Sequence, residues 1–259
     1  MRLKIDAMLD YDFPAPADVL LALEVAQMPD QRLIDDKLTV ATATPLTPVQ
    51  GQAGIGRRIW TRGEGKFVAR YQATVDVSRV ATELSRVAAV PLRELPGRVI
   101  HFLWPSRYCG SDEVKKFAVD QFGQLSGGAA VAAMAEWTRT NLTYEAVSDE
   151  QTTSDESFQQ RKGICRDFAH VLISFARSLD IPARMVGAYA WNLDPPDFHA
   201  VVEVYLDGGW YLVDPTGKAP VEGLVRIGVG RDATDVSFMT IFAGEAQLCA
   251  QTVAVERIG

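Results

Sequence analysis

Hydrophobic and polar positions alternate along much of the first 80 residues. A period of two with one apolar face is typical of a β-strand that is buried on one side. Strands are predicted over residues 3–9, 19–25, 33–42, 57–60 and 67–75. Stretches rich in proline or glycine, at residues 14–16, 45–48 and 63–65, predict turns between them. The short, regular spacing indicates an antiparallel β-sandwich-like or barrel-like N-terminal domain.

The pattern changes to a helical period after residue 110, beyond a proline-containing connector. Helices are predicted over residues 111–122 and 128–140. A third helix follows Gly163, where apolar residues recur at helical spacing: Ile164, Phe168, Val171, Leu172, Phe175 and Leu179. Pro182 ends this helix, because proline lacks a backbone N–H group. Further strands are predicted over residues 183–190, 199–206, 210–214, 224–229 and 252–255.

Cys165 lies in the first turn of the third predicted helix. The unpaired N–H groups and the positive end of the helix dipole favour a thiolate there, and the thiolate is the nucleophilic form of cysteine. The alternative is an inert cysteine that acts as a small hydrophobic residue. The position therefore allows a nucleophile without proving one.

A nucleophilic cysteine needs a base, and the chain has three histidines. His170 follows Cys165 by five residues on the same helix, so their side chains do not face each other and a structural role is expected for His170. His101 lies in the connector, with no acid placed beside it. His199 opens the predicted strand at 199–206, and Asp214 ends the next one.

The dipeptide Asp207-Gly208 between these strands predicts a hairpin. With a two-residue loop, Val201 pairs with Asp214, and the side chains of His199 and Asp214 lie diagonally on one face within reach of each other. A three-residue loop puts them on opposite faces. The local pattern allows both arrangements.

Several segments, taken in this order and at this spacing, resemble the transglutaminase-like superfamily of papain-type cysteine enzymes, in its bacterial branch of cysteine proteases. They are residues 163–170, 180–184, 187–189, 197–204 and 209–216. The resemblance implies that Cys165 is the nucleophile, His199 the general base and acid, and Asp214 the orienting acid. It also implies an α+β fold in two domains. Residues 1–105 are the β-rich domain with its connector, and residues 106–259 are a core in which the helix bearing the cysteine packs on an antiparallel sheet bearing the histidine and aspartate.

The implied reaction is acyl transfer or hydrolysis at an amide, either a peptide bond or a glutamine side chain, through an acyl-enzyme on Cys165. Hydrolysis is favoured over transfer to an amine, because no amine channel is evident. The N–H group of Cys165 is the expected first oxyanion donor, and the second is not identified. The alternative is a binding or scaffold module on the same fold.

Two aromatic residues are candidate substrate-binding groups. Trp191 begins a proline-containing loop that ends just before His199, and Tyr108 lies in an aromatic stretch at the end of the connector. For each the alternative is plain packing, of the hairpin for Trp191 and of the two domains for Tyr108. The acidic run at residues 148–157 is expected to be an exposed loop with a short helix, and residues 231–235 a turn closed by a salt bridge.

The charge and the cysteine content of the chain argue against several classes of binding partner. The net charge of −7 without a basic cluster argues against nucleic acid and against an anionic membrane surface as binding partners.

The three widely spaced cysteines, Cys109, Cys165 and Cys249, form neither a disulfide framework nor a zinc motif, so no metal is expected. The glycine-rich residues 51–56 lack the phosphate-loop pattern and are expected to form a turn, so no cofactor is expected. The implied amide chemistry leads us to expect a protein or peptide substrate. A cytoplasmic location is expected, because no signal-peptide core or membrane-spanning stretch is seen and a reducing setting suits a thiolate enzyme.

Overall fold

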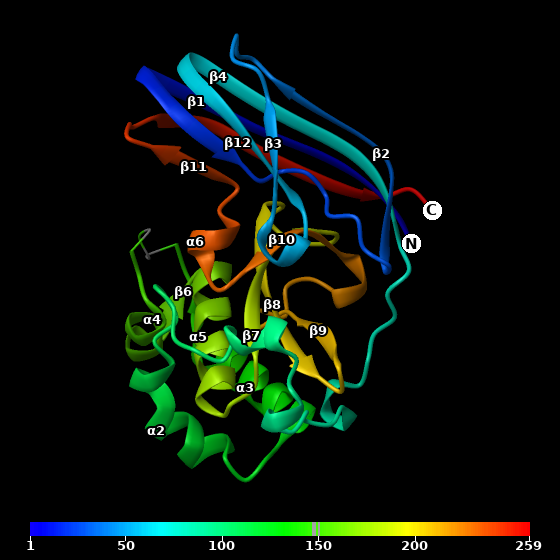
Figure 1. Cartoon of the computed structure of the whole chain (residues 1–259), viewed down its shortest axis with the longest axis vertical. Helices are drawn as coiled ribbons and strands as arrows, with labels where there is room; N and C mark the ends of the chain where they lie inside the picture. Colours follow the sequence, from blue (N-terminus) through cyan, green and yellow to red (C-terminus); the bar gives the residue numbers. More distant parts are fainter. Residues whose placement is uncertain (147–148, 150) are drawn as a thin grey trace.

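The computed structural model describes residues 1–146, 149 and 151–259. Within these residues the strands form a six-stranded sheet, a four-stranded sheet and one short parallel pair, and α2, α4 and α5 lie to the left of the four-stranded sheet in the view of Figure 1. The large sheet holds β1 (Arg2–Leu21), β2 (Gln31–Val40), β3 (Thr47–Gln50), β4 (Arg57–Val77), β11 (Met239–Phe242) and β12 (Gln247–Arg257). The second sheet, antiparallel in the order β10-β7-β8-β9, holds β7 (Ala183–Ala190), β8 (Phe198–Leu206), β9 (Gly209–Val213) and β10 (Leu224–Gly230). The helices are α1 (Gly97–Ile100), α2 (Ser111–Phe122), α3 (Gly127–Asn141), α4 (Ser154–Gln160), α5 (Cys165–Ser178) and α6 (Ala233–Val236).

The N-terminal region is β-rich and antiparallel, and the mixed α+β class is confirmed. Leu3, Ile5, Ala7 and Leu9 are buried, while the residues between them face outward, as the alternation predicts. The buried face packs on residues of β7, β8 and β10: Tyr189, Phe198, Val225 and Ile227. The six strands therefore form a single layer, and the layer opposite it is supplied by the second sheet.

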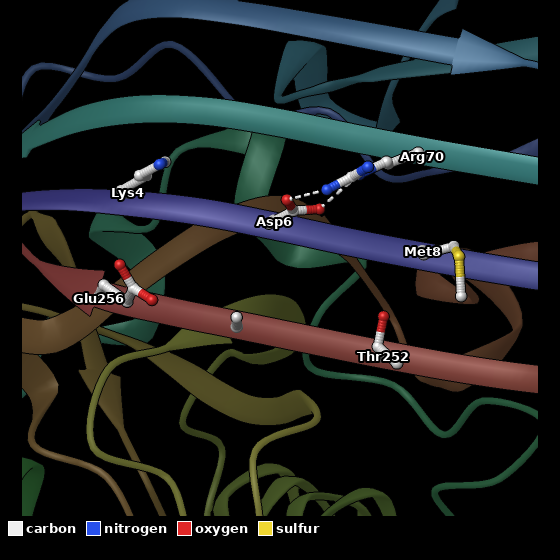
Figure 2. Close-up of a pocket in the computed structure, with 7 residues that line it drawn as sticks. Lys4, Asp6, Met8, Arg70, Thr252 and Glu256 are labelled. Atoms are coloured by element: carbon white, nitrogen blue, oxygen red, sulfur yellow. Dashed lines mark hydrogen bonds and ion pairs between the residues drawn. The ribbon is translucent and has the colours of Figure 1, made fainter.

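The outward face of the large sheet is polar. Figure 2 shows a hollow on this face between β1, β4 and β12, with the side chains of Lys4, Asp6, Arg70 and Glu256 around it. Arg70 donates two hydrogen bonds to the carboxylate of Asp6, so the charges in the hollow are partly neutralised. Ion pairs of this kind on an open sheet face contribute little to stability. This hollow lies on the side of β1 opposite to the buried core.

The turns predicted at residues 14–16 and 63–65 are wrong, because these residues lie inside the long strands β1 and β4. Residues 57–60 and 67–75 belong to one strand, β4, which runs through Gly63 and Gly65. Beside them β1 bulges between Phe13 and Ala17, where the register shifts. A Cβ atom at Gly63 would lie 2.6 Å from the ring of Phe13, so glycine there makes room for the ring at the bulge. These residues thus mark an irregular stretch of a continuous ribbon and not a chain reversal.

The end of the chain returns to the first sheet. The predicted strand at residues 252–255 is part of β12, which pairs with β1 from Leu3 to Asp12, and β11 pairs with the far end of β1. Residues 239–257 therefore pair with the N-terminal strands, although the predicted division assigned them to the core domain. The division at residue 105 itself stays a prediction.

Helix α5 is buried on nearly every side. It packs against α2, α3 and α4 on one flank and against β7 and β8 on the other. Its apolar residues join one core with those helices and strands, including Phe168, Val171, Leu172 and Phe175. The predicted helices at 111–122, 128–140 and after Gly163 are confirmed as α2, α3 and α5. Within the described residues no helix is long and apolar enough to cross a membrane.

A buried chain of charges joins the N-terminal segment to the second sheet. The carboxylate of Glu203, on β8, accepts from Arg184 at 2.8 Å and from Arg226 at 2.7 Å. Arg226 also donates to Asp30 at 2.7 Å, and Asp30 accepts from Arg79 at 2.7 Å. Glu203, Arg184 and Arg226 are almost fully buried, so each charge depends on its partners.

The structure describes part of the acidic loop that was predicted at residues 148–157. Residues 148 and 150 lie outside the described residues. Thr153 and Glu156 form a reciprocal capping box at the start of α4, which is the expected short helix before Cys165. The expected turn at residues 231–235 is also closed by a salt bridge, because the guanidinium of Arg231 lies 3.0 Å from the carboxylate of Asp235.

Candidate active site

Cys165 is the first residue of α5, and a tight turn places it there. Gly163 has φ +157°, and a Cβ atom on it would lie 2.6 Å from the Cβ of Asp167. The Asp167 carboxylate turns back over the start of the helix and accepts from the N–H group of Ile164 at 2.8 Å. Gly163 is thus required by both its backbone angle and this contact. Cys165 is held partly exposed at the end of a helix that is otherwise buried.

His199 and Asp214 meet across the β8–β9 hairpin. Leu206 pairs with Gly209, and both loop residues, Asp207 and Gly208, have positive φ, as a two-residue primed turn requires. The structure therefore selects the two-residue loop of the two predicted alternatives. Nε2 of His199 lies 2.9 Å from Oδ2 of Asp214, and both side chains are buried.

Asp214 is held by more than the histidine. Its Oδ1 atom accepts from the N–H and hydroxyl groups of Thr216, at 2.9 and 2.7 Å, and its Oδ2 atom accepts from the N–H of Ala219 at 3.0 Å. Burial acts to raise the pKa of this carboxyl, but the hydrogen bonds from His199 and Thr216 hold the pKa below its usual value. Asp214 is therefore an ionised acceptor, and Nε2 of His199 carries the proton between them.

The other ring nitrogen of His199, Nδ1, is buried and makes no hydrogen bond within the described residues. Burial acts to lower the pKa of His199, but the hydrogen bond with Asp214 and the neighbouring Cys165 side chain raise that pKa to about 9. Since Nε2 is bound to Asp214, Nδ1 is the atom available to the thiol. The raised pKa keeps the imidazole charged at neutral pH.

Tyr144 is a fourth residue at this site. It ends β5 (Thr143–Tyr144), which pairs in parallel with β6 (Lys162–Gly163), so that Tyr144 stands opposite Gly163. Its pKa is raised, first by burial and then by the charge of the neighbouring Cys165. The sequence analysis expected only extended structure here. No local pattern links a tyrosine to a cysteine 21 positions later, since their proximity comes from the parallel pairing.

The chain is similar to known proteins in its sequence and in its fold. The family described as "Transglutaminase-like superfamily" matches residues 116–215. An uncharacterized protein of Mycobacterium leprae is 34% identical over 222 residues, which span 80% of this chain and 68% of that protein. A solved structure named as a "Putative Cysteine Protease from Cytophaga hutchinsonii" superposes with a TM-score of 0.93 at 34% identity, covering 99% of this chain and 90% of that one.

The chain belongs to the transglutaminase-like superfamily.

Within this transglutaminase-like fold, the remaining predicted residues lie as follows. The ring of Tyr108 stacks on His170, with centroids 5.3 Å apart, and its N–H donates to Asp232 at 3.1 Å. Trp191 packs at the junction of the two sheets, where its N–H donates to the carbonyl of Gly223 at 3.0 Å. These contacts match the packing alternative for each residue. A substrate-binding role for Tyr108 or Trp191 stays a prediction.

His170 is fully buried behind the site. Its Nε2 atom accepts from the N–H of Ala233 at 3.2 Å, and burial lowers its pKa to about 3. It is therefore a neutral packing residue, and its position agrees with the structural role expected from the helical spacing. Among the described residues no group of three or more histidine, cysteine or acidic side chains is arranged to hold a metal ion.

Proposed function

We propose that this transglutaminase-like protein cleaves or transfers an amide through a covalent acyl-enzyme on Cys165. The observation that carries the proposal is the buried His199–Asp214 pair, with Nε2 and Oδ2 2.9 Å apart, together with a partly exposed cysteine at the start of α5. A cysteine, a histidine and an orienting acid in this order are the parts that nucleophilic catalysis at a carbonyl needs.

The reaction begins when the Cys165 thiolate attacks the carbonyl carbon, and the C=O electron pair moves to oxygen. The tetrahedral intermediate then collapses, the C–N bond breaks, and the leaving amine takes the proton of the His199 imidazolium. Asp214 keeps the ring oriented and supports its charged form. Water then attacks the thioester, His199 accepts the water proton, and the carboxylic acid leaves with regeneration of the thiolate.

The acyl acceptor is water in this proposal, and a protein or peptide is the substrate. A primary amine in place of water gives transamidation by the same steps. Water is present at about 55 M, so transfer to an amine requires a site that binds the amine and excludes water. Hydrolysis is therefore the favoured outcome.

The test is intact-protein mass spectrometry of wild type and Cys165→Ala after incubation with glutamine peptides and acyl esters, with and without a primary amine. We expect an acyl adduct on wild type alone, and product masses then separate hydrolysis from transfer. Cys249→Ala is the matched control, because Cys249 is an exposed cysteine on β12 and its loss leaves the adduct unchanged.

The rate of iodoacetamide labelling provides a second test of the reactivity of Cys165. Cys109 is buried, and burial raises its pKa to about 12, so it stays unlabelled in the folded protein. We expect Cys165 to react faster than Cys249 near neutral pH. Equal or slower labelling of Cys165, together with no acyl adduct, would count against catalysis and favour a binding module on the same fold.

A further inference from the structure

Lys218 is a partly exposed residue of the loop that follows Asp214. Its N–H group donates to the hydroxyl oxygen of Thr216 at 3.1 Å, and that hydroxyl donates to the carboxylate of Asp214 at 2.7 Å. The next residue, Ala219, donates its N–H group to the same carboxylate at 3.0 Å. The loop is therefore wrapped around the proposed orienting acid, and the backbone of Lys218 is fixed relative to that acid.

The side chain of Lys218 extends from this loop to the nucleophile side of the site. Its Nζ atom lies 4.6 Å from the ring centroid of Tyr144. The same ring contacts the ring of Phe168, with centroids 5.8 Å apart. Phe168 follows Cys165 by three residues on α5, and residues at this spacing lie on the same side of a helix. The ammonium of Lys218 is thus held near the start of α5, on the side that carries the thiol.

Tyr144, which supports the lysine, is tied to the turn that carries the nucleophile. It stands opposite Gly163 in the parallel pair of β5 and β6, and the N–H group of Glu145 donates to the carbonyl of Gly163 at 3.0 Å. Tyr144 is also 41% exposed, so it belongs to the surface that a substrate meets. The contact between Lys218 and Tyr144 therefore joins the cysteine side and the acid side of the site at that surface.

The positive charge of Lys218 is unmatched within the part of the chain that the structure describes. No carboxylate there forms an ion pair with its ammonium, and Asp214, at the start of the same loop, is bound to the imidazole. Arg139, which lies against this loop, is paired with Glu136. Contact with an aromatic face leaves N–H groups of an ammonium free to donate, because an ammonium has three of them. Lys218 can therefore bind an anion while it stays on the ring.

We propose that Lys218 is a specificity residue that binds a carboxylate of the substrate close to the amide that Cys165 attacks, a role that rests on the function proposed above. The preferred substrate is then a peptide with an acidic side chain beside the reacting amide. Its carboxylate accepts hydrogen bonds from the ammonium, which stays on the ring of Tyr144. A charge pair of this kind selects among substrates, because a neutral or basic side chain at the same place gains nothing or is repelled.

Alkylation of Cys165 by iodoacetate and by iodoacetamide tests this charge without any acyl-enzyme. Both reagents lose iodide to the thiolate, and they differ by one negative charge, so the ratio of the two rates isolates the effect of that charge. We expect Lys218→Gln to lower the ratio of iodoacetate to iodoacetamide about 5-fold, and Lys218→Arg to restore it. Added salt should lower the wild-type ratio towards that of Lys218→Gln.

Lys66→Gln is the matched control for this comparison. It removes the same charge from β4, where the side chain of Lys66 is 75% exposed and lies 3.7 Å from Asp10. We expect its alkylation ratio to equal that of wild type. Peptide mass spectrometry assigns the label to Cys165 and separates it from label on Cys249.

Acyl esters then show on which side of the reacting bond the carboxylate lies. The anionic probes are mono-p-nitrophenyl adipate, charged on the acyl part, and 4-acetoxy-3-nitrobenzoate, charged on the leaving part. Each acylation rate is taken relative to that of neutral p-nitrophenyl acetate. We expect Lys218→Gln to lower one of these relative rates about 5-fold, and Lys66→Gln to lower neither.

Each other outcome has a distinct meaning. If the alkylation ratio or both relative acylation rates of Lys218→Gln stay at the wild-type value, no carboxylate binds this lysine beside the reacting bond, and the inference is overturned. An equal fall in Lys66→Gln assigns the effect to the overall charge of the protein, which also overturns it. So does an equal fall of both alkylation rates with a lower melting temperature, because that is a structural role. If wild type forms no acyl-enzyme while the alkylation ratio falls as expected, the proposed function fails and Lys218 remains a carboxylate-binding residue.

Discussion

Nε2 of His199 lies 2.9 Å from Oδ2 of Asp214; His199 is on β8, and Asp214 directly follows β9 of the same hairpin. The hairpin loop sets this distance, because one additional loop residue would place the two side chains on opposite faces of the sheet. The carboxylate is fixed in turn by Thr216 and Ala219. The orientation of the imidazole is thus a property of the hairpin and the loop that follows it.

Replacing the orienting acid tests this relationship. In Asp214→Asn the amide no longer stabilises the charged imidazole and favours the wrong tautomer. We expect kcat on an amide substrate to fall by as much as about 10⁴-fold, the loss seen for the equivalent change in a serine protease triad. The measurement is steady-state kinetics with the glutamine peptide that gives the largest adduct. Asp120→Asn, at an exposed pair with Lys116 on α2, is the control and keeps full activity. An Asp214→Asn protein with near-normal kcat would contradict the assigned role.

The raised pKa of His199 predicts the pH dependence. Burial acts to lower this pKa, but the hydrogen bond with Asp214 and the neighbouring Cys165 side chain raise it to about 9. The leaving amine needs the proton of the imidazolium, so kcat/KM for an amide should fall as pH rises through about 9. An activated ester, whose leaving group needs no proton, should show a weaker decline. A falling limb centred near the ordinary histidine value of about 6.5 would show that the ion pair is not formed.

The same shift makes folding stability depend on pH. A histidine whose pKa is raised in the folded state stabilises the protein fully below its unfolded pKa of about 6.5, and this stabilisation is lost as pH rises through about 9. We therefore expect the difference in unfolding free energy between wild type and His199→Gln to shrink from pH 6.5 to pH 9.5. Urea denaturation across this range measures it. A difference that is constant or that grows with pH has the opposite sign and excludes the charged histidine.

The buried charges around Glu203 predict a large loss of stability. Glu203→Ala leaves Arg184 and Arg226 buried without the carboxylate they share. Removing one partner of a buried ion pair costs about 3–5 kcal/mol. Chemical denaturation checks this value. Asp76→Ala, whose partners Arg2 and Arg32 are exposed, is the control and should show no comparable loss. A Glu203→Ala protein as stable as this control would mean that water or another group compensates the arginines.

Replacing Gly163 is expected to lower stability and to slow the alkylation of Cys165. In Gly163→Ala the new Cβ atom would lie 2.6 Å from the Cβ and 2.7 Å from Oδ2 of Asp167, at a φ that L-residues rarely adopt. We expect a loss of about 1–3 kcal/mol and slower alkylation of Cys165, because the turn that presents the thiol is displaced. Gly97→Ala is the matched control, since no atom lies within 4 Å of its Cβ position. Wild-type stability and alkylation in Gly163→Ala would show that the turn tolerates a side chain.

Local patterns in the sequence were sufficient for most single elements. The period-two alternation of Leu3 to Leu9, the helical period after Gly163 and the Asp207-Gly208 loop each predict an element that the structure contains. They succeed because burial of one face and the backbone angles of a turn depend on residues only a few positions apart. The placement of Cys165 at a helix start and of His199 and Asp214 on neighbouring strands follows from the same local rules.

Only the tertiary structure decided which distant segments meet. It joins β12 to β1, continues β4 through Gly63, pairs β5 with β6 so that Tyr144 stands opposite Gly163, and surrounds Glu203 with arginines from two strands. Such contacts depend on the free energy of packing and on the closure of long loops, and no periodicity within a short window records them. The sequence by itself therefore determined the elements and the candidate nucleophile, base and acid. The long-range pairing of strands determined the geometry that surrounds them.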